Sequence, residues 1–356
     1  MSYEIAWERL DLSFRDPLRI GRQMDSATAH TVITHLADDH DRAEGRAGTG
    51  EAYAVEYYGE TTGTIPVVLP LLLAAVEPLA GELRGDLPTA VRALERASAA
   101  MDRALGHHGG AKAGIDIALH DLVGKRLGIP VHELLGLSSH VPPTDFTIGI
   151  DEPQVVAQRA ARVAHFPALK IKLGGPGDLA TLEAVRAVFG GPIRVDANTA
   201  WEPEAGARLV PELVRLGVEL IEQPFPAHRL DQMRWLQERS ALPIVADESA
   251  VTIDDLEGLV GVCAGVNVKL AKCGGVGPAK RMLERAKALG FKTFLGCMME
   301  TTVGIAASAA VASLADWIDL DGNLLLANDP YEGLALAGDC RWVLSTEPGL
   351  GVRRRE

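Results

Sequence analysis

Eight short apolar runs follow one another at regular intervals through the second half of the chain. They are Phe146–Ile148, Leu169–Leu173, Ile193–Val195, Leu220–Ile221, Ile244–Ala246, Val266–Val268, Thr293–Leu295 and Trp317–Leu320. Their centres lie about 25 residues apart, and helical patterns such as DLATLEAVRAVFG separate them. Parallel strands that are covered by helices on both faces are apolar throughout. The repeat therefore predicts an α/β protein in which eight strand–helix units close into a (β/α)8 barrel. A doubly wound open sheet is the alternative, but the spacing is even and no GxGxxG follows a first strand.

The first part of the chain has a mixed pattern. The sequence predicts a strand at Ala27–Ala37, a turn at Asp38–Arg46, a return strand from Ala47–Ala52, and helices at Val67–Leu83, Leu87–Ala104 and Ala111–Leu127. We predict three parts: an α+β capping domain over residues 1–125, the barrel over 126–325, and a segment over 326–356 that returns to the capping domain.

Charge and composition exclude several classes of function. The formal net charge of −13 disfavours nucleic acid as a partner, because such binding needs a basic surface. The most apolar run, Ile65–Gly81, contains three prolines and a glutamate and is too short to span a bilayer. The four cysteines have neither zinc-ligand nor disulfide spacing. We expect a cytoplasmic protein with no nucleic-acid or membrane partner.

Three of the predicted strands end in carboxylates at equivalent positions, namely Asp196, Glu222 and Asp247. Barrel enzymes carry their chemistry at the C-terminal ends of the strands, so these side chains should converge. A hard divalent cation with oxygen ligands would cancel their repulsion, and the absence of His and Cys from the motif favours Mg²⁺ over zinc. We predict one Mg²⁺ per subunit. Taken singly, each acid could instead pair with a lysine or cap a helix.

Lysines stand at two further strand ends. Lys170 and Lys172 share one face of the second strand, because side chains alternate along a strand. Lys269 ends the sixth strand, which lies opposite the second in an eight-membered ring. A neighbouring cation and partial burial lower the pKa of a lysine, so Lys170 and the metal would make Lys172 easier to deprotonate. By itself, KIK could equally be a polar edge strand or a phosphate site.

Two opposed lysines around a metal indicate proton transfer at carbon. One lysine would remove the α-proton of a metal-bound carboxylate, the metal would stabilise the enediolate, and the other lysine would return a proton to the opposite face. The outcome is inversion at the α-carbon. A single base with a spectator lysine would instead give elimination or cycloisomerisation.

The motifs KIK, DAN, EQP, DES and VKLAKCGG, in this order on successive strands, resemble the enolase superfamily in its muconate-cycloisomerase-like subgroup. GTGEA at 48–52 and AKAGIDIALHDLVGKRLG at 111–128 extend the resemblance over almost the whole chain. The resemblance implies an enolase-type fold, with a (β/α)7–8 TIM-like barrel and an α+β N-terminal capping domain. It also implies site roles: Asp196, Glu222 and Asp247 as Mg²⁺ ligands, Lys172 and Lys269 as acid/base lysines, and Lys170, Asn198 and Glu248 as supporting groups.

The eighth strand ends in Asp319-Leu320-Asp321, which resembles the DxD motif of the dipeptide epimerases. In that family the two acids hold the free α-ammonium group of the substrate, which muconate, succinylbenzoate and N-acylamino acids lack. The resemblance therefore implies epimerisation of the C-terminal residue of a dipeptide. The alternative is that either acid caps the segment that follows.

Further residues are candidates for contact with the substrate side chains. They lie in loops near residues 20 and 56 and after the seventh strand, and comprise Gln23, Met24, Asp25, Glu56, Tyr57, Tyr58, Met298 and Glu300. Epimerases for Ala-Glu place an arginine in the first loop, where this chain has Gln23, so we do not predict Ala-Glu specificity.

Other functions stay open at this level. Within the same subgroup they are N-acylamino acid racemase, o-succinylbenzoate synthase and muconate cycloisomerase, and outside it a non-catalytic barrel protein. All five metal and lysine positions are present, which favours an enzyme of the isomerase class. We also expect self-association into a homo-oligomer.

Overall fold

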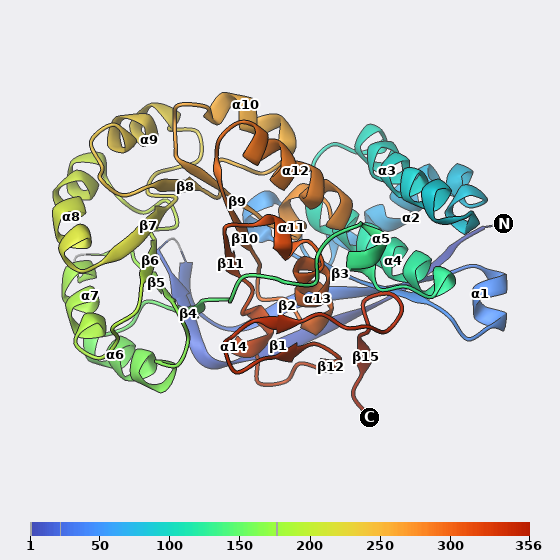
Figure 1. The fold of residues 1–356 in the computed structure, drawn as a ribbon, viewed down its shortest axis with the longest axis horizontal. Helices are drawn as coiled ribbons and strands as arrows, with labels where there is room; N and C mark the ends of the chain where they lie inside the picture. Colours follow the sequence, from blue (N-terminus) through green and yellow to red (C-terminus); the bar gives the residue numbers. More distant parts are fainter. Residues whose placement is uncertain (1, 22, 176) are drawn as a thin grey trace.

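The computed structural model describes residues 2–21, 23–175 and 177–356, apart from the side chains of residues 23–26. Eight parallel strands form one sheet in which every strand pairs with its neighbour in sequence (Figure 1). They are β4 (Phe146–Ile148), β5 (Leu169–Lys172), β6 (Ile193–Asp196), β7 (Val218–Glu222), β8 (Ile244–Ala246), β9 (Gly265–Val268), β10 (Lys292–Gly296) and β11 (Trp317–Asp319). A parallel bridge between Thr144 and Ile318 joins the two ends of the sheet. The predicted barrel is confirmed.

Helices cover the outside of the barrel (Figure 1). They are α6 (Pro153–Arg162), α7 (Asp178–Arg186), α8 (Pro203–Arg215), α9 (Leu230–Gln237), α10 (Leu256–Leu259), α11 (Leu270–Cys273), α12 (Val276–Ala288), α13 (Thr302–Ala309) and α14 (Gly322–Leu325). The helix after the last strand, α14, has only 4 residues. The seam between β11 and β4 is therefore covered differently from the rest of the ring. No helix in the described parts of the chain has the length and apolar content needed to cross a membrane.

The N-terminal part is a three-stranded antiparallel sheet packed against helices. Its elements are β1 (Glu4–Ile20), β2 (Gln23–Ala37), α1 (Asp39–Ala43), β3 (Gly48–Tyr53), α2 (Thr64–Val76), α3 (Leu87–Ala104), α4 (Gly109–Leu127) and α5 (Val131–Leu134). Short 3-10 turns occur at Glu56–Tyr58, Glu77–Leu79, Glu82–Arg84, Ile253–Asp255 and Ala312–Leu314.

Two predictions in this part were wrong in detail. The turn predicted at Asp38–Arg46 contains helix α1, because Asp38 and Asp41 form a reciprocal capping box. The helix predicted at Val67–Leu83 ends at Val76 and continues as two 3-10 turns, because Pro78 cannot donate to the helix ladder.

The glycines of GTGEA allow strand β3 to lie directly on helix α4. A Cβ on Gly48 would stand 2.0 Å from the carbonyl oxygen of Ala118, and one on Gly50 would stand 2.1 Å from that of Gly114. No side chain fits at these distances. The close contact fixes the sheet of the capping domain against the helix that leads into the barrel.

The last residues form the short strands β12 (Tyr331–Glu332), β13 (Ala335–Leu336), β14 (Trp342–Val343) and β15 (Arg353–Arg354), of which β12 and β15 contact β1 of the N-terminal sheet. Ala327 donates its N–H to the carbonyl oxygen of Ser13 at 2.8 Å, and Arg354 pairs with Glu8 on β1. The segment thus contacts the capping domain, while the three predicted domain boundaries stay a prediction.

Candidate active site

A cavity of about 360 Å³ lies where the C-terminal ends of the barrel strands meet the capping domain. The barrel contributes Lys172, Asn198, Asp247, Glu248, Lys269, Cys297, Met298 and Met299 to its wall. The capping domain contributes Phe14, Leu18, Ile20, Thr28, Ala29, His30, Tyr53, Ala54, Val55, Glu56, Tyr57, Tyr58, Thr61 and Thr62. One face of the cavity is therefore charged and the other is mixed aromatic and polar.

Strand register brings the predicted carboxylates to the same level of the barrel. Asp196 lies directly beside Glu222 in the pairing of β6 with β7, and Lys172 lies beside Asp196 in the pairing of β5 with β6. Asp247 follows β8, which pairs with β7. All three carboxylates are buried, with side chains at most 4% exposed. A barrel that aligns strand ends in this way makes these groups neighbours although they are far apart in sequence.

The lysines bind the carboxylates from two sides. Lys172 donates to Asp196 at 2.7 Å, and Lys269 donates to Asp247 at 2.9 Å. Strands β5 and β9 are four positions apart in the eight-stranded order, so the two lysines approach the cavity from opposite sides. Lys172 and Lys269 thus lie on opposite sides of the cavity with carboxylates between them, and their acid/base roles stay a prediction.

Lys170 lies deeper than Lys172 and does not line the cavity. Its ammonium group is 2.8 Å from Glu222, 2.8 Å from Asp319 and 3.3 Å from Asp196. Burial opposes its charge, but the Asp319 and Glu222 carboxylates outweigh burial and hold its pKa well above the ordinary value. Lys170 is therefore a fixed positive charge that orients carboxylates rather than a base.

Electrostatics in the site are governed by burial and by the carboxylates. Burial and the neighbouring Asp196 charge raise the pKa of Glu222 to about 7. Burial lowers the pKa of Lys269, but the Asp247 carboxylate outweighs this, so the pKa lies above its ordinary value. A lysine that acts as a base needs the opposite shift. Positive charge among the carboxylates would supply it, because it would weaken their pull on the ammonium group.

The donor set suits a hard divalent cation. The buried groups of the site comprise the carboxylates of Asp196, Glu222, Asp247, Glu248, Asp319 and Asp321 and the ammonium groups of Lys170, Lys172, Lys269 and Lys272. The carboxylates outnumber the lysines, and the buried Oδ1 of Asn198 accepts no hydrogen bond in the described parts of the chain. No three Asp, Glu, His or Cys side chains of those parts already converge on one point at ligand distance. Lysine ammonium groups occupy the space between the carboxylates instead.

Three groups that the sequence did not assign to the site's roles hold the carboxylates in place. The side-chain oxygen of Gln223 accepts the N–H groups of Asp247 at 2.9 Å and Ser249 at 3.1 Å. Lys272 donates to the carboxylate of Asp247 at 2.5 Å and to three backbone carbonyls. Asn267 donates to Glu222 at 2.8 Å. Gln223 belongs to the EQP motif, Lys272 to VKLAK, and Asn267 directly precedes VKLAK, so the signal was present in the sequence.

The structure does not bring Asp319 and Asp321 into the cavity wall. Asp319 pairs with Lys170 and accepts from the hydroxyl of Thr147 at 3.1 Å. Asp321 accepts the backbone N–H of Thr147 at 2.5 Å. Burial and the Asp319 charge raise the pKa of Asp321 to about 7. Both acids lie beneath the mouth of the barrel at the seam, so their predicted role in holding a substrate ammonium group stays a prediction.

The remaining predicted contacts are divided. Glu56 and Met298 line the cavity, as do Tyr57 and Tyr58, whereas Glu300 is buried and accepts the N–H of Met298 at 3.0 Å. The side chains of Gln23, Met24 and Asp25 lie outside the described residues. Residues missed by the sequence analysis are Phe14, Leu18, Ile20 and His30, which come from the β1–β2 hairpin. No sequence pattern marked Phe14, Leu18 and Ile20, because β1 itself was not predicted, while His30 lies in the predicted strand at Ala27–Ala37 but belongs to none of the motifs.

Comparison with known proteins identifies the family. Residues 17–136 match the model of the mandelate racemase / muconate lactonizing enzyme N-terminal domain, and residues 154–356 match the enolase C-terminal domain-like model. The chain belongs to this family of the enolase superfamily, as the sequence motifs predicted.

Curated relatives are epimerases of several specificities. The L-Ala-D/L-Glu epimerase of Bacteroides thetaiotaomicron is 39% identical over 87% of this chain and 79% of its own. The L-Lys-D/L-Arg epimerase of Methylococcus capsulatus is 39% identical over 68% of this chain and 71% of its own. The prediction that the chain is an enzyme of the isomerase class is confirmed by these relatives.

A solved structure supports the same assignment. The dipeptide epimerase of Enterococcus faecalis, complexed with Mg and the dipeptide L-Leu-L-Tyr, has a TM-score of 0.87 and 30% identity. The matched region covers 99% of this chain and 99% of the epimerase chain. The enolase-type fold is thereby confirmed, and the magnesium of this complex confirms the cofactor that the sequence predicts for the family.

Proposed function

We propose that this protein is a Mg²⁺-dependent dipeptide epimerase that inverts the α-carbon of the C-terminal residue. The observation that carries the proposal is that Lys172 and Lys269 line one cavity from opposite strands of the barrel, with the Asp196 and Asp247 carboxylates between them. Inversion by proton transfer needs one acid/base group on each face of the α-carbon, and this arrangement supplies both.

The residues would divide the work as follows. Asp196, Glu222 and Asp247 would hold Mg²⁺, which when bound supplies positive charge beside the substrate carboxylate and acidifies the α-proton. One of the two cavity lysines would accept that proton, and the other, as an ammonium group, would donate a proton to the opposite face. Asn198 and Glu248 line the same wall as supporting groups, and the Asn198 amide N–H would donate to the carboxylate group of the substrate.

The two substrate side chains would face the capping domain. Its wall contains Glu56 together with Tyr57 and Tyr58 near the mouth, and Met298 closes the barrel side. Relatives at similar identity act on acidic and cationic dipeptides alike, so identity does not select a substrate. A polar mouth with one carboxylate favours cationic or aromatic side chains over glutamate.

A second candidate is a racemase of N-acylated amino acids in the same family. It is favoured by the positions of Asp319 and Asp321, which bond to Lys170 and Thr147 and do not line the cavity, so neither of these two acids faces a substrate ammonium group there. Self-association and a cytoplasmic location stay predictions.

The test is α-proton exchange in deuterated water. The Mg²⁺-loaded protein is incubated with pooled L,L-dipeptides and, separately, with pooled N-acyl-L-amino acids, and deuterium is detected by mass spectrometry. Label in a subset of dipeptides, with inversion of the C-terminal residue, supports the proposal. Label only in N-acylamino acids would replace it with the second candidate.

A further inference from the structure

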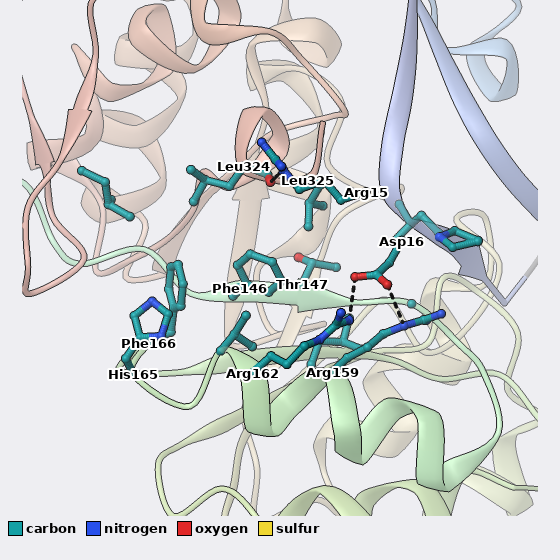
Figure 2. Close-up of a pocket in the computed structure, with 16 residues that line it drawn as sticks. Arg15, Asp16, Phe146, Thr147, Arg159, Arg162, His165, Phe166, Leu324 and Leu325 are labelled. Atoms are coloured by element: carbon teal, nitrogen blue, oxygen red, sulfur yellow. Dashed lines mark hydrogen bonds and ion pairs between the residues drawn. The ribbon is translucent and has the colours of Figure 1, made fainter. Parts of the chain in front are cut away.

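A second cavity of about 400 Å³ lies outside the barrel, at the seam between its last and first strands (Figure 2). It occupies the place where a full eighth helix would pack, since α14 has only 4 residues. Its wall is formed by segments from three parts of the chain: the end of β1, the β4–α6 unit, and the stretch from α14 to β13. None of the metal and lysine residues of the active site lines it.

The floor of this seam cavity is apolar. The side chains are those of Pro17, Leu18, Phe146, Ile148, Val163, Phe166, Leu324, Leu325 and Leu336. Such a concave apolar surface is typical of small-molecule sites rather than of a solvated groove. A ligand that fills it must therefore have an apolar body.

The rim is basic, in a chain whose formal net charge is −13. Arg15, Arg159, Arg162 and His165 border the cavity, and Asp16 is the only carboxylate among its described lining residues (Figure 2). Asp16 lies between Arg162 at 2.8 Å and Arg159 at 3.6 Å, so one acid is shared by two guanidinium groups. Arg159 also pairs with Asp151, which does not line the cavity, so the guanidinium groups of Arg15, Arg159 and Arg162 exceed their carboxylate partners by one.

Arg159 in particular has an unused donor. Its Nη2 donates to Asp151 at 2.8 Å, but its Nη1 is buried and has no hydrogen-bond partner among the residues the structure describes. A buried N–H without a partner costs free energy, and a turn of the guanidinium group toward the cavity that Arg159 lines would let a ligand acceptor remove that cost. A carboxylate is the acceptor that suits a guanidinium group best.

We propose that the seam cavity is a binding site for a small amphipathic carboxylate, with its apolar body on the Phe146–Leu336 floor and its carboxylate at Arg159. The charge of the rim and the unused donor select an anion, and the floor selects an aryl or branched alkyl body. This site is distinct from the proposed active site and does not depend on it.

The test uses 3-phenylpropionate as the probe, titrated calorimetrically into the Mg²⁺-loaded protein. The neutral 3-phenylpropanamide tests the anion requirement, and propionate tests the apolar body. We expect the carboxylate to bind at least tenfold more tightly than the amide or propionate. Equal affinity for the amide, or no heat with any probe, would overturn the proposal.

Variants locate the site. Arg159→Gln removes the donor, with Arg208→Gln as the control, because Arg208 is exposed on α8 away from the cavity. Leu336→Trp fills the cavity, with Val343→Trp on the partner strand of the same hairpin as the control, because Val343 is 53% exposed. We expect both cavity variants to lower the affinity for 3-phenylpropionate at least tenfold. Both control variants should leave that affinity unchanged. If Leu336→Trp lowers the melting temperature, its loss of probe binding could reflect misfolding, and the affinity of Arg159→Gln alone then decides where the probe binds.

Lys172→Met separates this site from the active site. We expect unchanged probe affinity in that variant, whereas loss of binding would assign the probe to the active site and overturn the proposal. Sedimentation of Leu336→Trp is run in parallel. A change of oligomeric state there, together with no probe binding to the wild type, would mean that the cavity is an interface between copies of the chain.

The two cavities share one wall residue, Leu18, at the end of β1. A ligand that packs on one side of Leu18 should change the shape of the other side, so saturating 3-phenylpropionate should shift KM more than kcat. This last readout rests on the proposed epimerase function. Binding without any shift in KM would overturn the coupling through Leu18, while the calorimetric result still decides the site itself.

Discussion

Two layers of charge occupy the inside of the same barrel and differ in how completely they are paired. In the upper layer, Lys172 at the end of β5 lines an open cavity and pairs with the buried Asp196 at the end of β6. In the lower layer, Arg194, two residues earlier on β6, pairs with Asp145 at 2.8 Å and with Glu219 at 2.9 Å. Side chains two residues apart on a strand share a face, so the two layers are stacked.

The lower layer is closed. Trp317 donates to Glu219 at 3.1 Å, and the cations of Lys170 and Arg194 both lie over the ring of Phe294, 5.4 and 5.3 Å from its centre. None of these groups lines the active-site cavity. Charges inside the barrel thus pair with one another in the lower layer, whereas in the upper layer carboxylates are in excess beside a cavity, where the proposed function needs them.

The largest effect should come from the cavity lysines. Lys172→Met and Lys269→Met should each lower the rate of epimerisation by about 10³-fold or more, because a positioned acid/base group is removed. Steady-state rates with the dipeptide found by exchange give the measurement. The control is Lys280→Met, an exposed pair partner of Glu284 on α12, which should keep full activity. Normal rates in either cavity variant would contradict the upper-layer assignment.

The next effect compares two glutamates of one strand. Glu222→Gln should weaken Mg²⁺ binding at least ~100-fold, because it removes a charged ligand, whereas Glu219→Gln should leave it nearly unchanged. Both lie on β7, but only Glu222 belongs to the upper layer. Calorimetric titration of Mg²⁺ measures both. Equal losses in the two variants would show that the layers are not functionally distinct.

The lower layer should control stability instead. Arg194→Met leaves Asp145 buried without its partner, which should cost about 3–5 kcal/mol of the free energy of unfolding. Urea denaturation gives the value, with Arg208→Met as the exposed control. Mg²⁺ affinity of the folded variant should be close to that of the wild type. A stable variant with weakened Mg²⁺ binding would reverse the roles of the two layers.

A smaller effect is expected at the interface between the domains. Glu51 on β3 is fully buried and accepts from Thr301 and Gly304 at the start of α13. Burial and the Glu300 charge raise its pKa to about 8. A raised folded-state pKa of an acid means that its contribution is complete below the unfolded pKa, near 4.5, and is lost as pH rises through about 8.

Stability should therefore decline gradually over this pH range, and Glu51→Gln, which mimics the protonated acid, should flatten the decline. Melting temperatures between pH 5 and 9 provide the check. Glu56→Gln, exposed on the same side of the domain, is the control. An unchanged slope in Glu51→Gln would show that Glu51 is not the group responsible.

The barrel strands could be predicted because each is a buried apolar run of fixed period, and the strand ends then identified Asp196, Glu222, Asp247 and the lysines. Strand β1 could not, because most of its side chains are exposed or half-buried and it has no apolar face of its own. The capping box that starts α1 is visible in the sequence as Asp38 and Asp41, but the polar residues around it are equally typical of a turn.

Contacts across the seam could not be predicted at all. The pair between Lys170 and Asp319 joins residues 149 positions apart, and it depends on how the last strand closes on the first. Local pattern placed Asp319 on a strand end correctly, but not its partner. The seam cavity also depends on how the last strand closes on the first. It lies where the short helix α14 leaves the seam uncovered.

The most direct test of the account follows α-proton exchange from each epimer separately. Wild-type protein, Lys172→Met and Lys269→Met are incubated with Mg²⁺ and either the L,L or the L,D form of a substrate dipeptide in deuterated water, and α-proton signals are followed by NMR. With one lysine on each face, Lys172→Met should still exchange the proton of one epimer and Lys269→Met that of the other. Loss of exchange from both epimers in each variant, or exchange of both epimers in either, would contradict the opposed pair.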